Sequence, residues 1–550
     1  MAGLACSRRS TAREVRLVAR GLAFALVAAL AAACSTVMPG ADYPRTASVA
    51  LADPQDTVLG KQFTAESIAH HGESAFRIIG NGVDGFLARV QMIDAATRTL
   101  DLQYYIFRGD QTGRLITDAL ARAAMRGVRV RVLVDDGDTV AGDEQILALD
   151  GHPLTEVRIF NPFSYRGHSQ LRRGFEFSFD AVRLDYRMHN KLLIVDNSIA
   201  LVGGRNIGNQ YFQMDPTSQL ADDDVFSAGP IVKQLSATFD EYWNSRFAIP
   251  ARALAHLARS GGEVARRHVR ARQRRQMRTL ASPGVDYTAK IASDEPFADM
   301  ISGRLPIVWA SAEVVCDSPE KKLVRSRQRF GRLMEQAVAA AAADTQSEML
   351  MITPYLIPAA DEMKLLAGMR KRNVTIRILT NSLQSAPELL PQSGYMHYRR
   401  ALLAEGVDLY ELRAQLGNTR GSGQTARISR FGNYSLHAKQ FVFDRRRVFY
   451  GSMNFDQRSR HLNTEVGLII DSPELAAETV ARFEKMVAPE NAYRVRLLAP
   501  PAGKAAGKGR MVWDTVEAGK PVEYTREPAR SAAQRAEVDA LTLVHVDSEL

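Results

Sequence analysis

Two histidines in this chain each stand two residues before a lysine, at positions where the surrounding residues favour a β-strand. In a strand, residues i and i+2 point to the same face, so His189 should lie beside Lys191, and His437 beside Lys439. An imidazole next to a fixed cation suits a phosphate ester, because one group can attack or transfer a proton while the other neutralises oxyanion charge.

Each pair belongs to a longer block with a common spacing. Residues 188–206 read MHNKLLIVDNSIALVGGRN, and residues 436–454 read LHAKQFVFDRRRVFYGSMN. Both blocks follow His-x-Lys-x4-Asp, and Asp196 and Asp444 are the acids that complete this catalytic motif. Strand alternation places these two carboxylates on the face opposite the histidines, so we expect them to orient the motif or to have a structural role.

A glycine-containing turn ends each block and brings small residues toward the expected phosphate position. In the first block Asn206 ends this turn, and in the second block Ser452 and Asn454 occupy it. Amide and hydroxyl groups at such a turn can donate hydrogen bonds to a phosphate. We therefore expect these three residues to bind substrate.

The blocks are the ends of two similar halves. Residues 99–136 and residues 348–382 both read as strand, loop, amphipathic helix and strand, and a third strand follows at 157–160 and at 407–410. Strand, helix and strand at this spacing indicate βαβ units and a mostly parallel sheet with helices packed on it. The sequence predicts an α/β protein with two copies of one domain.

Length, composition and the repeat together predict the organisation of the chain. With 550 residues, 46% hydrophobic and 24% charged, it is long enough for more than one globular domain. In chain order we expect a lipoprotein-type signal peptide at 1–33, a tether at 34–75, domain 1 at 76–250, an Arg-rich linker at 251–304, domain 2 at 305–490, and a C-terminal extension at 491–550.

The N-terminus has the pattern of an export signal. Five arginines precede the apolar run Gly21–Ala33, whose 13 residues are too few for an ordinary membrane span. Ala31-Ala32-Ala33 leads directly to Cys34 and resembles a bacterial lipobox, which predicts lipidation of Cys34; an ordinary cleaved signal is the alternative. Ser35 at the next position favours an outer-membrane tether facing the periplasm over retention in the inner membrane.

The net charge indicates which partner molecules the chain favours, and the cysteines bear on disulfides and metal sites. The formal net charge of +10 favours anionic partners, such as phospholipid surfaces or nucleic acid, without choosing between them. An Arg-rich stretch at 252–278, with nine arginines, could contact anionic lipid or be a solvated linker helix. The three cysteines form no disulfide framework, and no spaced His/Cys cluster predicts a metal site.

The duplicated motifs resemble the phospholipase D superfamily. The similarity extends over roughly residues 75–490 and is closer to one bacterial branch, the cardiolipin synthases of the C type, in stretches such as LDLQYYIF, YRMHNKLLIVD, LVGGRNIGNQYF and GSMNFDQRS. The resemblance implies two α/β/α sandwich domains related by a pseudo-twofold axis, with one active site at their interface. It also implies a phosphohistidine intermediate and a reaction without metal or other cofactor.

The family also has an acidic residue after each motif. Glu465 matches that place in the second half, and Asp222 in the first, because both stand seven residues before a small residue followed by proline. An acid hydrogen-bonded to an imidazole fixes its tautomer and supports its basicity. Asp222 is one of three adjacent acids, so a plain surface loop is the alternative there. Gly204 departs from the serine usual in the superfamily.

The resemblance implies phosphatidyl transfer between phospholipids. We expect a phosphatidylglycerol headgroup as acceptor, with anionic and zwitterionic phospholipids and a membrane surface as partners. Hydrolysis with water would use the same site, and a nucleic acid phosphodiesterase is a third possibility that the export signal disfavours. A lipid-tethered scaffold with a dead site conflicts with two intact motifs. The sequence leaves open which histidine is the nucleophile, and we favour His189.

Overall fold

The computed structural model describes nine stretches of the chain: residues 38–137, 149–166, 169–215, 217–254, 296–302, 304–321, 334–415, 434–499 and 509–543. The predicted signal peptide and Cys34 lie outside the described residues. The same is true of the Arg-rich stretch beyond residue 254.

The first half builds a mixed sheet around the first motif. Its strands lie in the spatial order β9-β4-β3-β2-β5-β6-β8-β1. Their bounds are β1 Ser74–Ile79, β2 Thr99–Tyr104, β3 Arg129–Asp135, β4 Thr155–Phe160, β5 Lys191–Val195, β6 Ile199–Gly203, β8 Asp224–Ala228 and β9 Ala248–Pro250.

The second half repeats this order and adds two strands at one edge. Its order is β20-β19-β18-β13-β12-β11-β15-β16-β17-β10, in which the last eight strands correspond one by one to the first half. Their bounds are β10 Val308–Cys316, β11 Glu348–Ile352, β12 Thr375–Asn381, β13 Asp408–Leu412, β15 Gln440–Phe443, β16 Arg447–Gly451, β17 Val466–Asp471, β18 Ala492–Leu498, β19 Arg510–Glu517 and β20 Lys520–Tyr524.

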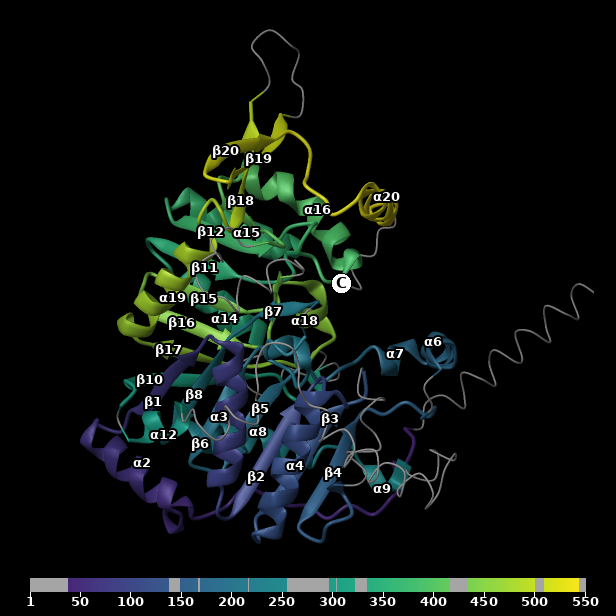
Figure 1. Ribbon diagram of the computed structural model, residues 1–550, viewed down its shortest axis with the longest axis vertical. Coiled ribbons are helices and arrows are strands. Elements are labelled where there is room, and N and C mark those ends of the chain that lie inside the picture. The colour runs from purple at the N-terminus through teal and green to yellow at the C-terminus, as the bar shows by residue number, and fades with distance from the viewer. Residues whose placement is uncertain are drawn as a thin grey trace, which may run out of the picture.

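The two sheets are continuous with each other. Strand β10 pairs with β17 through residues 311–316 and with β1 through residues 308–310, which makes one 18-stranded sheet among the described residues. Figure 1 shows the first half in purple and blue below the second half in green and yellow. The predicted fold, two similar α/β domains in one chain, is confirmed.

The expectation of a mostly parallel sheet is wrong. The three strands predicted in each half do pair in parallel, β2 with β3 and β3 with β4, and likewise β11 to β13. Each motif strand, however, runs antiparallel to the first of these and returns through a tight hairpin, β5–β6 or β15–β16. A hairpin needs only a short connection, whereas a parallel pair needs a crossover helix.

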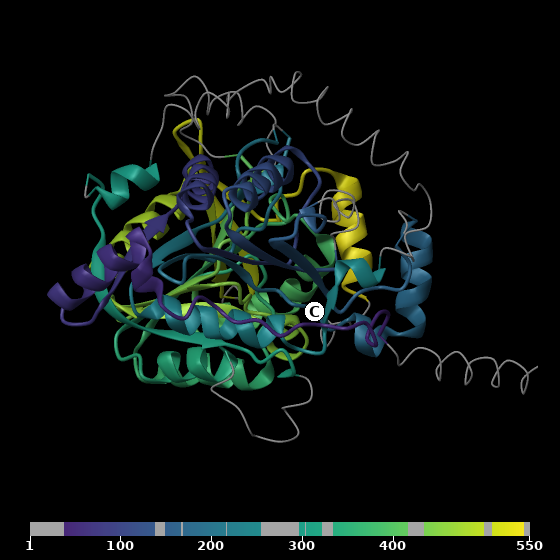
Figure 2. The same ribbon diagram turned by 90° about the horizontal axis from the view of Figure 1, so that it is seen from below.

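Helices cover the sheets and enclose three apolar cores. Helices lie on both faces of the sheets (Figure 2). One outer core lies under α3 and α4, a second under α14 and α15, and a central core joins both halves and includes α8 and α19. The helical segments are η1 Pro54–Asp56, α2 Val58–Ala69, α3 Gly82–Ala95, α4 Gln111–Met125, α6 Gln170–Phe179, α7 Ala181–Leu184, η3 Asn209–Tyr211, α8 Ile231–Trp243, α9 Ala251–Leu254, α12 Pro296–Ile301, α14 Met334–Ala343, α15 Ala360–Lys371, α16 Leu389–Ala404, α18 Gln457–His461, α19 Pro473–Met486 and α20 Ala532–Leu541.

Local capping explains where several of these helices begin. The side chain of Asp110 accepts a hydrogen bond from the Gly113 amide at the start of α4. Ser472 does the same for the Leu475 amide at the start of α19, where Pro473 follows the cap. Such caps satisfy amides that have no partner within the helix. The helices that follow β2 and β17 therefore start at fixed points.

The C-terminal extension contains more structure than the sequence indicates. Only one strand, near residues 522–524, is recognisable there. The structure has three strands and α20, and β18 continues the second sheet by pairing with β13. In β18 and β19, arginines and acidic residues interrupt the alternation of apolar and polar side chains, so neither segment reads clearly as a strand. Among the described residues, no helix is both long and apolar enough to cross a bilayer.

Candidate active site

Two aspartates of the motifs fasten the hairpins that carry the histidines. The Asp196 carboxylate accepts hydrogen bonds from the amides of Thr97, Arg98 and Thr99 at 2.8–2.9 Å. Asp444 likewise accepts from the amides of residues 346–348. Neither carboxylate contacts a histidine in these interactions. Both tie the end of the motif strand to the start of the neighbouring strand, which is a structural role.

The first histidine is positioned by the second half of the chain. The His189 amide donates to the Thr464 carbonyl at 2.9 Å, and Met188 forms a parallel bridge with Thr464. The next residue, Glu465, reaches Nδ1 of His189 with Oε2 at 2.9 Å. Both side chains are buried. Occupation of Nδ1 by the carboxylate directs Nε2 away from it and into the site.

The second histidine is held by equivalent contacts, with the roles of the two halves interchanged. Strand β14, Tyr434–Leu436, pairs in parallel with β7, Gln219–Ala221, and the His437 amide donates to the Ala221 carbonyl at 2.8 Å. The next residue after β7 is Asp222, whose Oδ2 lies 2.5 Å from Nδ1 of His437.

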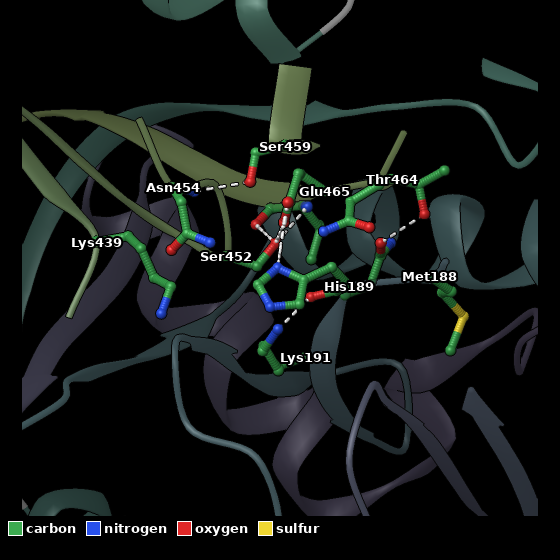
Figure 3. Close-up of polar contacts among 12 residues, drawn as sticks. Met188, His189, Lys191, Lys439, Ser452, Asn454, Ser459, Thr464 and Glu465 are labelled. Carbon is green, nitrogen blue, oxygen red and sulfur yellow. Dashed lines mark hydrogen bonds and ion pairs between the residues drawn. The ribbon is translucent and has the colours of Figure 1, made fainter. Parts of the chain in front are cut away.

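Each histidine therefore receives its acid from the opposite half. The acid follows directly after the residue whose carbonyl accepts the histidine amide, so the backbone pairing sets the side-chain pairing. Figure 3 shows His189 below Ser452 and Glu465, which belong to the second half. One composite site with residues from both halves results, rather than two separate sites.

Two buried lysines line this site. Lys191 Nζ donates to the carbonyl of His189, and Lys439 Nζ lies 3.0 Å from Nδ1 of His437. Burial and the charge of Lys439 bring the pKa of Lys191 well below its usual value, against the opposing effect of Glu465. Burial also lowers the pKa of Lys439 to about 8, although Asp222 and Glu465 oppose this. A phosphate among these ammonium groups would offset the cost of burying them.

The acids give the two histidines different electrostatic surroundings. Burial raises the pKa of Glu465 to about 7 despite the charge of Lys191. For Asp222, burial alone would raise the pKa, but His437, Lys439 and Arg205 together lower it to about 2. Asp222 is therefore ionised at neutral pH, whereas Glu465 titrates close to it.

The surroundings of both histidines disfavour protonation of the imidazole. Burial, followed by the charges of Lys191 and Lys439, brings the pKa of His189 well below its usual value. Burial and Lys439 lower the pKa of His437 to about 4, and Asp222 works against that decrease. The neutral imidazole is the form that can attack phosphorus or accept a proton.

The departure at Gly204 has a steric explanation. In the second half the Ser452 hydroxyl donates to Glu465 Oε2 at 2.5 Å. In the first half the acid is one methylene shorter, and a Cβ atom at position 204 would overlap the Asp222 carboxylate. Glycine therefore leaves room for Asp222 to approach, while serine fits beside the longer Glu465.

The predicted substrate-binding amides are held differently in the two halves. Asn206 donates from Nδ2 to the Tyr211 hydroxyl at 2.9 Å and accepts from the Ile106 amide at 3.1 Å. The buried Oδ1 atom of Asn454 has no hydrogen-bond partner within the described part of the chain. Figure 3 shows the Asn454 side chain near His189, on the side of Lys439.

The three adjacent acids of the first half have separate partners. Asp222 contacts His437, Asp223 contacts Arg482 and Gln440 of the second half, and Asp224 in β8 pairs with arginines of its own half. All three are buried. The alternative of a plain surface loop does not describe this segment.

Several residues of the site do not stand out in the sequence. Tyr105 and Tyr211 present their rings edge-on to His189 and His437, with centroids 5.0 and 5.2 Å apart. The Glu465 amide donates to Asp317, whose carboxylate also binds Lys321 at 2.7 Å. Tyr105 and Tyr355 stand near the end of the first strand of each half, and this repetition is a sequence signal for Tyr105. The other contacts depend on long-range packing.

Comparison with known proteins identifies the family. The family model described as "Cardiolipin synthase, PLD-like domain" matches residues 90–243 and again residues 338–487, which together are more than half of the chain. The chain belongs to this family. Membership confirms the predicted relation to the phospholipase D superfamily, and the two matched segments correspond to the two halves of the structure.

Relatives of this family cover most of the chain. Cardiolipin synthase C of Escherichia coli (strain K12) is 35% identical over 489 residues, which are 87% of this chain and 96% of the relative. The major cardiolipin synthase of Bacillus subtilis (strain 168) is 23% identical, over 75% of this chain and 69% of the relative. The predicted enzyme class, a phospholipase D-type phosphatidyltransferase, is thereby confirmed.

A search of solved structures gives a further likeness. The crystal structure of phosphatidylserine synthase from Haemophilus influenzae Rd KW20 matches with a TM-score of 0.49 and 13% identity, over 78% of this chain and 91% of that chain.

Proposed function

We propose that this cardiolipin synthase-like enzyme transfers a phosphatidyl group from a donor phospholipid to phosphatidylglycerol through a covalent intermediate on His189. The observation that carries the proposal is the composite site, in which two buried histidines from different halves lie beside two buried lysines. Such a site has both groups that a two-step displacement requires: a nucleophile, and an acid that can later act as a base.

In the first step, Nε2 of His189 attacks the donor phosphorus. The bond from phosphorus to the headgroup oxygen breaks. His437, protonated when the anionic phosphate binds beside it and the ionised Asp222, supplies the proton that this oxygen takes up. We assign the nucleophile to His189 because burial and the two lysines disfavour its cationic form, and because Glu465, whose pKa is raised to about 7, supports that cation less than Asp222 supports the one on His437. The ionised Asp222 supports a transient positive charge on His437, which suits the acid.

In the second step, a hydroxyl of phosphatidylglycerol attacks the phosphohistidine. His437 accepts the hydroxyl proton, the phosphorus–nitrogen bond breaks, and His189 is released with its lone pair. Lys191 and Lys439 stabilise the negative charge on the phosphoryl oxygens in both steps, and Asn454 is placed to donate from its amide. Glu465, which accepts from the Ser452 hydroxyl, orients the His189 ring. Asn206 donates to Tyr211, whose ring lies edge-on to His437.

The location of the enzyme is a further part of the proposal. The predicted lipobox supports a chain that is lipidated at Cys34, exported and tethered to a membrane on the periplasmic side, with the outer membrane favoured by Ser35. A phospholipid surface is then within reach of the site. Nucleic acid substrates are disfavoured by the same export signal.

A lipid-product experiment tests the reaction. Purified protein is incubated with mixed vesicles of phosphatidylethanolamine and phosphatidylglycerol, and the lipids are identified by mass spectrometry. We expect cardiolipin from the wild-type protein, and a loss of about 10³-fold or more in rate for His189→Ala and for His437→Ala. His397→Ala, at an exposed histidine outside the site, is the matched control and should retain activity.

The intermediate can be observed directly. In His437→Ala, the first step can proceed slowly with activated donors, so a phosphatidyl adduct should accumulate on the peptide that contains His189. Phosphatidic acid without cardiolipin would identify a hydrolase that uses water as the acceptor. An adduct on His437 in the reciprocal His189→Ala variant would reverse the assignment of roles.

A further inference from the structure

The segment just before the first motif has an unusual distribution of apolar side chains. Of the 13 large hydrophobic side chains that are exposed among the described residues, five lie between residues 171 and 182. They belong to α6 and α7, which project from the periphery of the first half (Figures 1 and 2). Large apolar side chains gathered on a surface indicate a binding partner.

Three of these side chains form one stripe along α6. Leu171, Phe175 and Phe179 are spaced by four residues, so they share a face of the helix, and their exposed fractions are 87%, 67% and 49%. The rings of Phe175 and Phe179 lie 4.6 Å apart. We refer to these three residues as the apolar stripe. Val182, in α7, adds a fourth side chain that is 76% exposed.

The polar face of α6, by contrast, is turned toward the protein. The buried Arg173 donates to the Asp136 carbonyl, and its guanidinium lies 4.1 Å from the centre of the Phe163 ring. The Glu176 carboxylate accepts from the amides of Ser164 and Tyr165 at 2.6 and 2.9 Å. An ordinary surface helix buries its apolar face and exposes its polar face. Here the polar contacts fix the helix so that the apolar stripe faces outward.

The anchored segment is connected directly to the active site. Its anchor, Asp136, is adjacent to Asp135, which accepts from the Met188 amide at 2.8 Å and pairs with Arg187. The end of α7, Leu184, precedes His189 by five residues. A partner bound at the apolar stripe would therefore lie on the chain segment that leads into the first histidine.

We propose that α6 and α7 insert the apolar stripe into the surface of a phospholipid bilayer and so present lipid phosphates to the histidines. The inference rests on the proposed function, which requires a lipid substrate. Aromatic and aliphatic side chains on an anchored helix suit the boundary between headgroups and acyl chains. The exposed Arg172, beside the stripe, complements anionic lipid headgroups.

Amide hydrogen exchange on the full-length chain tests where the bilayer binds. With vesicles of phosphatidylethanolamine and phosphatidylglycerol, we expect exchange in residues 170–184 to become slower by about fivefold or more. Helix α2 is the internal control, because Val58 and Ile68 are also exposed apolar residues, 72% and 74%, and its exchange should not change. Unchanged exchange in residues 170–184 would overturn the proposal, whatever the rest of the chain binds.

A matched pair of variants tests the consequence for turnover. In Leu171→Ser/Phe175→Ser/Phe179→Ser we expect turnover of vesicle lipids to fall about tenfold, because less apolar area enters the bilayer. Turnover of a short-chain phospholipid below its micellar concentration should stay unchanged. Val58→Ser/Ile68→Ser should leave both rates unchanged.

The other outcomes have distinct meanings. Equal losses on vesicles and on dissolved substrate would assign the segment to positioning His189, and would overturn the docking role. Sedimentation that reveals dimers lost in the triple variant, without protection by vesicles, would assign the stripe to a second copy of the chain. Vesicle protection without turnover of any lipid would contradict the proposed function and leave the docking surface intact.

Discussion

The proton between His189 and Glu465 determines whether the imidazole can act as a nucleophile. When Glu465 is ionised it accepts the Nδ1 proton, and Nε2 keeps its lone pair. When Glu465 is protonated it donates to Nδ1, so the neutral imidazole carries its proton on Nε2 and cannot attack. Burial raises the pKa of Glu465 to about 7. The active tautomer is therefore present above this pH and is lost below it.

The pH dependence of turnover follows from this tautomer. We expect kcat for the wild-type protein to fall about tenfold per pH unit below pH ~7. Glu465→Gln should lower kcat about 10²-fold, and its remaining rate should lack the acid limb. Asp456→Asn is the control, because burial also raises the pKa of Asp456 to about 7. If Asp456→Asn removes the limb and Glu465→Gln keeps it, the limb belongs to Asp456.

Gly204 and Ser452 form a second residue-scale test, because they occupy matching positions beside different acids. Gly204→Ala places a Cβ atom against the Asp222 carboxylate and should displace it from His437. We expect kcat/KM to fall about 10²-fold, as small misplacements of catalytic groups do. Ser452→Gly removes one hydrogen bond to Glu465 and should cost only about tenfold. Wild-type activity in Gly204→Ala would contradict the need for this close approach.

At the scale of elements, the motif hairpins depend on their aspartates. Asp196 is fully buried at a backbone φ of +52° and accepts from the amides of Thr97 and Thr99. Asp196→Ala should reduce the free energy of unfolding by about 3 kcal/mol, because buried donors lose their acceptor and alanine is strained at that φ. Asp196→Asn should cost about 1 kcal/mol, since asparagine tolerates positive φ and keeps one oxygen.

Urea denaturation measures these differences, and activity separates structure from chemistry. Asp444→Ala, at the more exposed equivalent position, should cost less than Asp196→Ala. Folded protein of each variant should keep kcat within about tenfold of the wild type, because neither carboxylate contacts a histidine. A folded Asp196→Asn with the activity of His189→Ala would indicate a direct catalytic role.

Elements with local periodicity could be predicted from the sequence, and elements that depend on distant partners could not. The strands β2, β3 and β4 and their counterparts follow from alternation and turn residues. Strand direction depends on which strands become neighbours, so the antiparallel part of each sheet was missed. The same limit applies to β18, whose partner β13 lies about 80 residues earlier in the chain.

In the candidate site, too, the local contacts could be predicted from the sequence and the long-range contacts could not. The spacing of two residues is local, and it correctly places each lysine beside its histidine. Glu465 and Asp222 could be selected from their positions, but not assigned to a histidine, because these contacts span 276 and 215 residues. Only the packing of the two halves determines that each acid serves the opposite histidine.

At the scale of the whole molecule, the two halves are interlocked rather than merely adjacent. The sheet continues from β1 to β10, and the central core contains side chains from both halves. Arg458 of the second half pairs with Asp185 of the first at 2.6 Å, directly beside the first motif. The two halves share one sheet and one central core, and each half supplies the acid for the histidine of the other. Both histidines therefore belong to one site within one chain.

This geometry predicts the result of mixing two inactive proteins. His189→Ala lacks the nucleophile and His437→Ala lacks the acid, and each full-length chain contains one composite site that is already incomplete. An equimolar mixture should therefore have no more activity than the separate variants, which lipid mass spectrometry can measure. If instead the site formed between two chains, the mixture would regenerate intact sites, and a quarter to a half of the wild-type activity would return. Co-refolding the two variants from urea repeats the comparison after their halves have been free to pair with either chain. If activity returned only after co-refolding, the contacts between halves could form between chains as well as within one.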